Sequence, residues 1–292
     1  MMKLAILGPG NDAAGYTTKR LLEEARKQFK KACLVPVAEV MLKVNDGMDA
    51  MWEGRSILDY DYILPRIDSK RAQIGYHVMR FLDETGVRKP FSASSIVTAH
   101  NKFLTLIEMV RRDIPVPETW ITGSKDMAGG IIDKQKMPVI MKLLSGFGGE
   151  GVMIMESKEA AKATIHTMKT LKQEILIEKY LPNPGEDIRG IVAGDEVIAS
   201  FKRIANSGEQ KANIHLGGRG VDFKLSPEMR EIVLKAAKAI GSKICAIDMV
   251  ESKGKAYVIE ANINPGLKGI EKATNINVAQ RIIDFVRGEI RR

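Results

Sequence analysis

The sequence has few cysteines and few aromatic residues. Only Cys33 and Cys245 occur among 292 residues, and aromatic residues make up 5% of the chain. Two cysteines so far apart give neither a disulfide framework nor a zinc-binding pattern, and their apolar neighbours predict that both lie in the core. The basic residues are dispersed, with no pattern of interleaved aromatic residues, which argues against nucleic acid as the partner.

Long apolar runs are also absent. No run approaches the roughly 20 residues that a membrane-spanning helix needs, and residues 1–8 enter strand-like sequence without the cleavage region of a signal peptide. We therefore expect a cytoplasmic protein with no membrane partner. The net charge is +9, from 45 lysines and arginines against 36 aspartates and glutamates. This excess favours an anionic partner, whether a nucleotide, a nucleic acid or an acidic peptide, without choosing among them.

Strand-like and helix-like patterns alternate near the N-terminus, at 3–7, 17–31, 32–37, 62–65 and 69–85. Such alternation predicts an α/β fold with an open, largely parallel sheet covered by helices. A connecting helix is expected at 98–112, followed by a small α/β module and then by a second region of sheet and helices. We predict three units, which span 1–98, 99–184 and 185–292.

The most informative segment lies near the C-terminus and ends two predicted strands in oxygen ligands. The runs 244–250 and 256–263 flank a polar, glycine-containing turn, which is typical of a β-hairpin. Glu260 and Asn262 would share one face of the second strand, and antiparallel pairing can bring Asp248 close to both. Carboxylate and amide oxygens suit magnesium, whose coordination nucleotide phosphates often complete. The alternative is a solvated sheet face without a metal.

A second motif joins a lysine to a glycine-rich turn. Lys142 ends a strand-like run, and four glycines follow at 146, 148, 149 and 151. Glycine lets successive backbone N–H groups approach phosphate oxygens while the lysine supplies a point charge, so the segment suggests a phosphate clamp. It lacks the terminal Gly-Lys-Ser or Gly-Lys-Thr of a P-loop and the helix that a Rossmann fingerprint requires. A plain flexible turn is the alternative.

The order of these and other motifs resembles a known family. It runs through Asn101-Lys102, Met141-Lys142-Leu143, the glycine loop, the strand 175–181, Glu186-Asp187-Ile188-Arg189, Lys202-Arg203, Lys211-Ala212-Asn213, Ile247-Asp248 and the segment 260–272. Spread in sequence over about 170 residues, the set is far more specific than any short motif alone. It resembles the ATP-grasp carboxylate–amine ligases of the RimK type, the alpha-L-glutamate ligases. The resemblance implies an ATP-grasp fold with an N-terminal pre-ATP-grasp sheet, a small central lid and a C-terminal metal-binding domain.

The resemblance also implies roles for particular residues. Lys102 and Lys142 would contact ATP phosphates, Asp187 the ribose and Asp248, Glu260 and Asn262 two magnesium or manganese ions. The remaining ATP-binding positions would be Gly146, Gly148, Gly149, Glu178, Lys179, Tyr180, Leu181, Lys211 and Asn213. Arg203 and Lys142 would be catalytic, and the substrate positions would be Arg189, Arg203, Asn264, Gly266 and Gly269.

Two positions depart from the family's pattern. Glu178-Lys179-Tyr180 stands where Gln-Glu-Tyr is usual, which leaves open which side chain contacts the purine. Lys211-Ala212-Asn213 stands where Arg-Ser-Asn is usual, and the change removes a hydroxyl and a bidentate donor.

The implied reaction forms an amide bond through an acyl phosphate made from ATP. The substrates would be L-glutamate, or a similar amino acid, and the C-terminal carboxylate of a protein, such as a ribosomal protein. The alternatives are a pterin or deazaflavin coenzyme or an amino-group carrier protein as the acceptor. A different class of function would be a non-catalytic module that binds nucleotide or RNA. The resemblance further implies a homo-oligomer, for example a tetramer.

Overall fold

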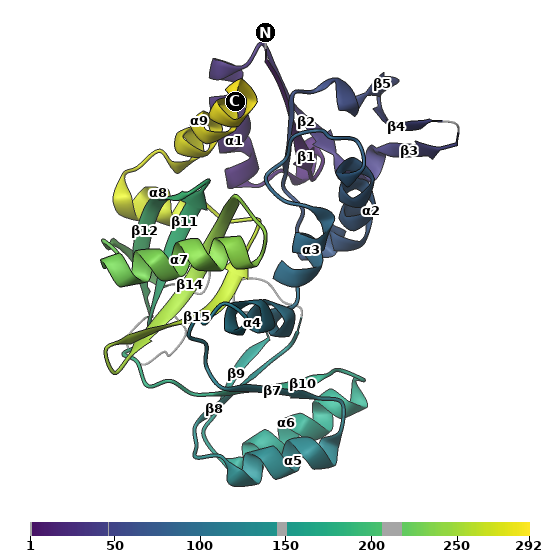
Figure 1. Ribbon diagram of the computed structural model, residues 1–292. Coiled ribbons are helices and arrows are strands. Elements are labelled where there is room, and N and C mark those ends of the chain that lie inside the picture. The colour runs from purple at the N-terminus through teal and green to yellow at the C-terminus, as the bar shows by residue number, and fades with distance from the viewer. Residues whose placement is uncertain (1, 46, 145–150, 206–217) are drawn as a thin grey trace.

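The computed structural model describes residues 2–45, 47–144, 151–205 and 218–292. Three sheet-containing regions follow one another along the long axis of the molecule (Figure 1). The N-terminal sheet lies at one end, the C-terminal sheet in the middle and a small module at the other end. Within the described residues, no helix combines the length and the apolarity that a membrane crossing requires.

The N-terminal region is built on a parallel sheet. Its strands are β1 (Lys3–Gly8), β2 (Lys31–Pro36) and β6 (Tyr62–Pro65), in the order β2-β1-β6. Alternate residues of β1 face opposite sides of the sheet. On one side Leu4 packs in a core with Leu21 of α1 (Tyr16–Gln28). On the other side Leu7 packs in a second core with Val78 of α2 (Ala72–Asp83). The predicted parallel sheet with helices on its faces is thereby confirmed.

Two features of this region differ from the sequence-based expectation. A meander of β3 (Met41–Val44), β4 (Met48–Trp52) and β5 (Arg55–Ser56) projects from the N-terminal region (Figure 1), although no strand was predicted there. The prediction of one continuous helix at 98–112 is wrong, because α3 (Ala93–Ala99) ends before α4 (Lys102–Val110) begins. The break occurs where the Asn101 Oδ1 accepts hydrogen bonds from the N–H groups of Phe103 and Leu104 and so caps α4.

The central module, which we call the lid, is an antiparallel sheet in the order β7-β10-β8-β9 with two helices on one face. Its core is its own, formed by residues such as Ile132, Met141, Ile165 and Ile177. In chain order its elements are β7 (Thr119–Thr122), α5 (Lys125–Lys134), β8 (Val139–Lys142), β9 (Val152–Met155), α6 (Lys158–Thr170) and β10 (Ile175–Lys179).

The C-terminal region is an antiparallel sheet in the order β13-β12-β11-β14-β15. Helix α7 packs on one face, where Val233 shares a core with Ile188 and Ile247, and α8 and α9 lie on the other side. The elements are β11 (Glu186–Ala193), β12 (Glu196–Ile204), β13 (Arg219–Asp222), α7 (Pro227–Ala239), β14 (Ile244–Ser252), β15 (Lys255–Asn262), α8 (Lys268–Thr274) and α9 (Val278–Arg291). Short 3-10 turns at Asn11–Ala13, Val37–Glu39, Ile57–Asp59 and Ser69–Arg71 complete the fold.

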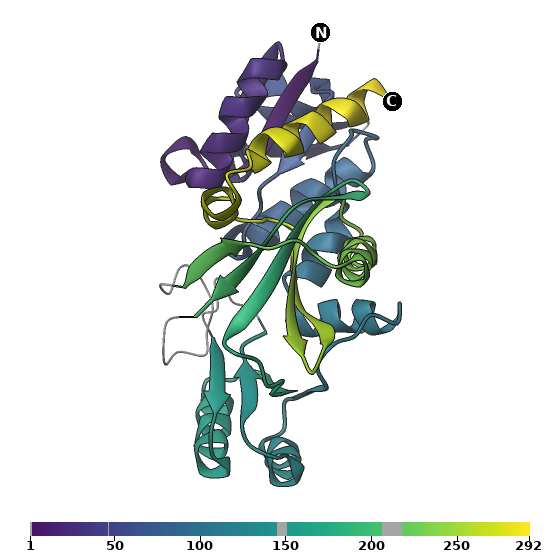
Figure 2. The same cartoon turned by 90° about the vertical axis from the view of Figure 1, so that its left-hand side faces the viewer.

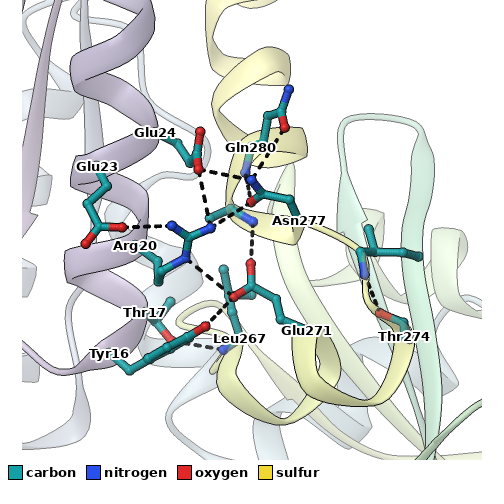
Figure 3. A network of polar contacts seen from close by, with 12 residues as sticks. Tyr16, Thr17, Arg20, Glu23, Glu24, Leu267, Glu271, Thr274, Asn277 and Gln280 are labelled. Atoms are coloured by element: carbon teal, nitrogen blue, oxygen red, sulfur yellow. Dashed lines mark hydrogen bonds and ion pairs between the residues drawn. The ribbon is translucent and has the colours of Figure 1, made fainter.

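The N-terminal and C-terminal regions share their cores, and together we call them the body. Helix α9 lies against α1 (Figure 2), and Ile282 and Ile283 of α9 belong to the same core as Leu4 and Leu21. A polar network crosses this junction (Figure 3): Arg20 of α1 donates to Glu24 and to Asn277 Oδ1, at 3.3 and 3.2 Å, and lies 3.8 Å from a Glu271 oxygen. The last helix therefore joins the N-terminal sheet to the C-terminal region.

Candidate active site

The hairpin predicted near the C-terminus is present. Strands β14 and β15 are joined by a turn in which Lys253 and Gly254 have φ values of 52° and 74°, the conformation of a tight two-residue hairpin loop. The register sets Asp248 opposite Glu260 and Ala246 opposite Asn262, with a bulge after Asp248. The strands therefore bring the two carboxylates together, and Asn262 lies two residues from Glu260 along the same strand.

Two arginines converge on Asp248, which is only 2% exposed. Arg189 lies opposite Asp248 on β11, and its Nε and Nη2 donate to the two carboxylate oxygens at 2.6 Å each. Arg203 donates from Nη2 to Asp248 Oδ2 at 2.8 Å and from Nε to Asp187 Oδ1. Such forked pairs fix the position of both partners. The site residues of three neighbouring strands are thus tied into one buried network.

Burial and charge act in opposite directions on the two aspartates. Burial tends to raise the pKa of Asp248, but Arg189 and Arg203 outweigh it and hold that pKa well below its usual range. Burial also raises the pKa of Asp187, and here the nearby Asp248 carboxylate adds to the increase while Arg203 opposes it. Asp248 is therefore the more acidic of the two carboxylates.

The lid contributes a second buried ion pair. Lys142 of β8 donates from Nζ to Glu178 Oε2 on β10 at 2.7 Å, and the two side chains are 8% and 3% exposed. Across from the lid, Lys102 begins α4. Burial lowers the pKa of Lys102, the Glu260 carboxylate opposes that shift and the Lys142 ammonium reinforces it. Lys102 therefore senses the charges of Lys142 in the lid and Glu260 in the body.

A cavity of about 130 Å³ lies between the lid and the body. One part of its wall is apolar and includes Ile140, Val152, Ile154, Val250 and Ile259. The charged part consists of Lys102, Lys142, Glu178, Glu186, Asp187, Arg203, Asp248 and Glu260. An apolar slot beside a cluster of charges matches the two ends of a nucleotide, a flat base and a charged phosphate chain.

The cavity gathers many of the residues that the sequence singled out, but not all of them. Tyr180 and Leu181 also line it. The Lys179 side chain is exposed and lies 3.4 Å from the Glu118 carboxylate, so it turns away from the cavity. Arg189 reaches the site through Asp248. Asn262, Asn264, Gly266 and Gly269 are not part of the cavity wall, and Gly146, Gly148, Gly149, Lys211 and Asn213 lie outside the described residues.

Sequence reasoning missed the apolar wall. Ile140 lies two residues before Lys142 on β8, so the two side chains share a face of the strand, and strand alternation could have identified it. Ile259 lies next to Glu260 on β15, and Val250 comes two residues after Asp248 on β14. Apolar residues in a strand indicate burial without telling whether protein or ligand covers them, so their role becomes visible only once lid and body are assembled.

The donor set fits a hard cation. Asp248 and Glu260 offer carboxylates across the hairpin, and Asn262 offers an amide oxygen, which accepts the N–H of Asn264 at 2.8 Å. Among the described residues, no group of three or more histidine, cysteine, aspartate or glutamate side chains is arranged to hold a metal. A metal at this hairpin would therefore rely on the amide as well as on the two carboxylates.

Comparison with known proteins decides the family. Residues 99–286 match the RimK-like ATP-grasp domain, and residues 2–96 match the RimK pre-ATP-grasp domain. The chain belongs to the RimK-like ATP-grasp family. It is 32% identical over 293 residues to a probable alpha-L-glutamate ligase of Thioalkalivibrio sulfidiphilus, an alignment that covers 99% of this chain and 97% of that protein. A probable alpha-L-glutamate ligase of Legionella pneumophila is 34% identical, over 98% of this chain and 95% of its own.

Solved structures confirm the ATP-grasp fold. The ATP-grasp ligase PsnB in complex with a minimal precursor superposes with a TM-score of 0.78 at 16% identity, over 99% of both chains. A structure of the same ligase with precursor, Mg and ADP gives 0.77 at 16% identity, over 99% of this chain and 98% of that one. The RimK-like protein is therefore an ATP-grasp ligase, an enzyme that uses ATP to form carbon–nitrogen bonds.

Proposed function

We propose that this RimK-like ligase joins L-glutamate to the C-terminal carboxylate of a protein through an acyl phosphate. The observation that carries the proposal is the cavity between lid and body, where two lysines, Arg203 and the carboxylates of the hairpin meet beside an apolar slot. In this scheme the acceptor carboxylate attacks the γ-phosphate of ATP and ADP leaves. The glutamate amine then attacks the acyl carbon, the amide bond forms and inorganic phosphate leaves.

The nucleotide would lie with its base in the apolar part of the cavity, beside the segment from Glu178 to Leu181. Lys102 and Lys142 would contact the phosphates from opposite sides, since one belongs to the body and the other to the lid. Asp187 would meet the ribose. The phosphates would take over part of the role of the Glu178 carboxylate as the negative charge beside Lys142. Because Lys142 belongs to the lid, ATP bound to the body would then draw the lid toward it.

Asp248, Glu260 and Asn262 would hold two magnesium or manganese ions. Such ions neutralise charge on the phosphates as it develops during phosphoryl transfer. Arg189 donates to both Asp248 oxygens and would orient this proposed metal ligand. Two of its guanidinium nitrogens are used in this way, so it would not bind the substrate through both of them. Arg203 lines the cavity and is fixed by Asp187 and Asp248. Its guanidinium would hold the acceptor carboxylate and then the acyl phosphate.

A protein acceptor is supported by the net charge of +9, which attracts acidic chain ends. The relatives are named as glutamate ligases, which supports glutamate as the amino acid. We also propose that the enzyme assembles as a homo-oligomer, which light scattering would measure. A pterin or deazaflavin coenzyme and an amino-group carrier protein are the competing acceptors, and they are separate arms of the test below.

The test is phosphate release from ATP in the presence of magnesium, with glutamate and one candidate acceptor at a time, followed by mass spectrometry of the acceptor. We expect release that requires glutamate and Mg²⁺, together with peptides that gain glutamyl residues. Glu260→Gln is the control, because it removes one proposed metal ligand. Turnover with a coenzyme or carrier protein but with no peptide would refute the protein acceptor. ATP binding without release on any acceptor would favour the non-catalytic module.

A further inference from the structure

Arg66 is a buried cation whose surroundings in the chain do not satisfy it. It directly follows β6, and the residue is only 7% exposed. Within the described part of the chain, its guanidinium makes one hydrogen bond, from Nη2 to the Pro265 carbonyl at 3.1 Å, and its Nε has no partner. Burial lowers the pKa of Arg66 to about 10. Among the described residues no carboxylate forms a direct ion pair with Arg66, and a buried charge with few hydrogen bonds destabilises the fold, so a ligand would supply the missing partners.

Two more buried polar atoms without partners lie in the same neighbourhood. One is Asn264 Oδ1, and Asn264 precedes the proline that Arg66 contacts. The other is His100 Nδ1. Burial lowers the pKa values of both His100 and Arg66, and the Asp68 carboxylate opposes the shift in each case, so the two side chains share one charged neighbour. Arg66 and the residue that precedes its hydrogen-bond partner thus both carry a buried polar atom without a partner in the described structure.

The position of Arg66 in the fold favours a ligand. Strands β1, β2 and β6 run parallel and end at one edge of their sheet, and open parallel sheets bind ligands at their carboxyl ends. The turn after β1 approaches Arg66 closely, because a Cβ on Gly8 would lie 3.0 Å from the Arg66 Cβ. The edge faces the segment 263–267, which directly follows the proposed metal ligands on β15.

That segment is held against the N-terminal region at a second place. The N–H of Leu267 donates to Thr17 Oγ1 at 2.9 Å, as Figure 3 shows. Thr17 carries no charge, and the bond leaves its hydroxyl partnered. The segment therefore has two anchors on the body, a neutral one at Thr17 and a charged one at Arg66, and only the second has unused hydrogen-bonding capacity in the described structure.

We propose that Arg66, with His100 and Asn264, binds the incoming amino acid, with Arg66 holding one of its carboxylates. This inference rests on the proposed ligase function and adds the position of the second substrate. A guanidinium fork matches a carboxylate, His100 Nδ1 can donate in one tautomer, and the Asn264 oxygen can accept from the amine. Arg66 does not line the cavity in which Arg203 would hold the activated carboxylate. Because Arg66 is only 7% exposed, the proposed occupant is a small molecule rather than a polypeptide chain.

The test compares Arg66→Met and Arg66→Lys with Thr17→Val by steady-state kinetics, with the KM measured separately for glutamate, ATP and acceptor. We expect each Arg66 variant to raise the KM for glutamate, roughly 10- to 100-fold for Met and less for Lys, because a charged hydrogen-bonded contact is lost or weakened. The KM values for ATP and acceptor should stay unchanged. Thr17→Val removes the neutral anchor and should leave the glutamate KM near that of the wild type.

Glutamine and the α-amide of glutamate identify which carboxylate Arg66 holds. The amide that lacks the carboxylate held by Arg66 should have a high KM in the wild type, and Arg66→Met should raise that KM no further. The other amide keeps this carboxylate, so Arg66→Met should still raise its KM. If the Met variant does not fold, the Lys variant gives the same comparison. The proposal is overturned if both amides remain equally sensitive, if all KM values rise together, or if Thr17→Val matches the Arg66 variants. A wild type without glutamate-dependent phosphate release would instead refute the function on which the proposal rests.

Discussion

The lid and the body are packed in opposite ways. The lid encloses a core made only of its own residues, among them Ile132, Met141 and Ile165. The body has two cores, and each contains residues from both the N-terminal and the C-terminal sheet. The body therefore folds as one piece in spite of its two sheets, whereas the lid can lose or keep its packing independently. The cavity lies where these two differently built parts meet.

The charged site residues of the lid and those of the body also form separate networks. The lid supplies the Lys142–Glu178 pair, which already neutralises itself, and the body supplies the network of two arginines and two aspartates around Asp248. Neither half requires the other for charge balance. A nucleotide with metal ions is the kind of ligand that can engage both halves at once, so the division suggests how binding and lid position are coupled.

The largest expected effect is on turnover and comes from the hairpin in the body. Glu260→Gln and Asp248→Ala should each lower kcat on the order of 10³-fold, because each removes a proposed metal ligand. Their stabilities should differ. Asp248→Ala also leaves Arg189 without its buried counter-ion and Arg203 with Asp187 alone, at a cost of about 3–5 kcal/mol in the free energy of unfolding.

Glu260→Gln lacks that second effect. Its free energy of unfolding should stay within about 0.5 kcal/mol of the wild type. Urea denaturation with phosphate-release assays on the same samples measures both quantities. Two variants that are equally stable would contradict the role given to the arginine network, and an active Glu260→Gln would contradict the metal site.

A smaller effect on turnover is expected from the lid. Lys142→Met should lower kcat/KM for ATP by roughly 10²-fold, because the lysine that we propose to contact the phosphates is lost. Lys179→Met is the matched control, since it lies on the neighbouring strand with its side chain exposed beside Glu118. It should leave kcat/KM unchanged. Equal losses in the two variants would show that the lid acts through its general surface charge.

Core substitutions compare the two packing modes directly. Ile283→Ala in the body and Ile165→Ala in the lid both truncate a side chain that is at most 1% exposed, which should cost about 2–5 kcal/mol locally. The body variant should lower the main unfolding midpoint. The lid variant should speed amide hydrogen exchange across residues 119–179 and leave β1 and β14 protected. Faster exchange in the body as well would show that lid and body form one cooperative unit.

The smallest effect concerns the junction of α1 and α9. Burial tends to raise the pKa of Glu24, but Lys27 and Asn277 lower it below its ordinary value. A carboxylate with a lowered folded-state pKa stabilises the protein above its unfolded pKa, and this contribution is lost as the pH falls through the folded value. Glu24→Gln should therefore cost at most about 1 kcal/mol at neutral pH, because Lys27 is exposed.

The loss should shrink as the solution becomes acidic. Thermal unfolding of the variant and the wild type between neutral pH and pH values below the ordinary glutamate range measures the difference. A difference that grows toward acid would contradict the lowered pKa of Glu24.

Local patterns predicted the parts of the molecule that local interactions determine. The turn at Lys253-Gly254 and the facing of Asp248 and Glu260 followed from composition and strand alternation, and the parallel N-terminal sheet followed from the β–α order. The break between α3 and α4 was missed because a capping Asn101 inside an apolar helical pattern reads as an ordinary helix residue. The meander at 41–56 was missed because its outer strand β3 is largely exposed and carries little apolar alternation.

Long-range pairings were out of reach of sequence reasoning. That Arg203 bridges Asp187 and Asp248 depends on the register of three strands, which distant turns determine. Arg66 carried no local signal, because a single arginine after a strand is usually a surface residue. Its burial becomes evident only when the N-terminal sheet meets the segment around Pro265, 199 residues further along the chain.

The most direct test of the central claim measures amide hydrogen exchange with and without a non-hydrolysable ATP analogue and Mg²⁺. We expect slower exchange in β8 and β10 of the lid and in β11 and β14 of the body together, because the nucleotide would bridge both. The projecting meander β3 to β5 should be unaffected, and Glu260→Gln should weaken the protection on both sides. Protection confined to the lid or to the body alone, or found away from the cavity, would contradict a nucleotide site between them.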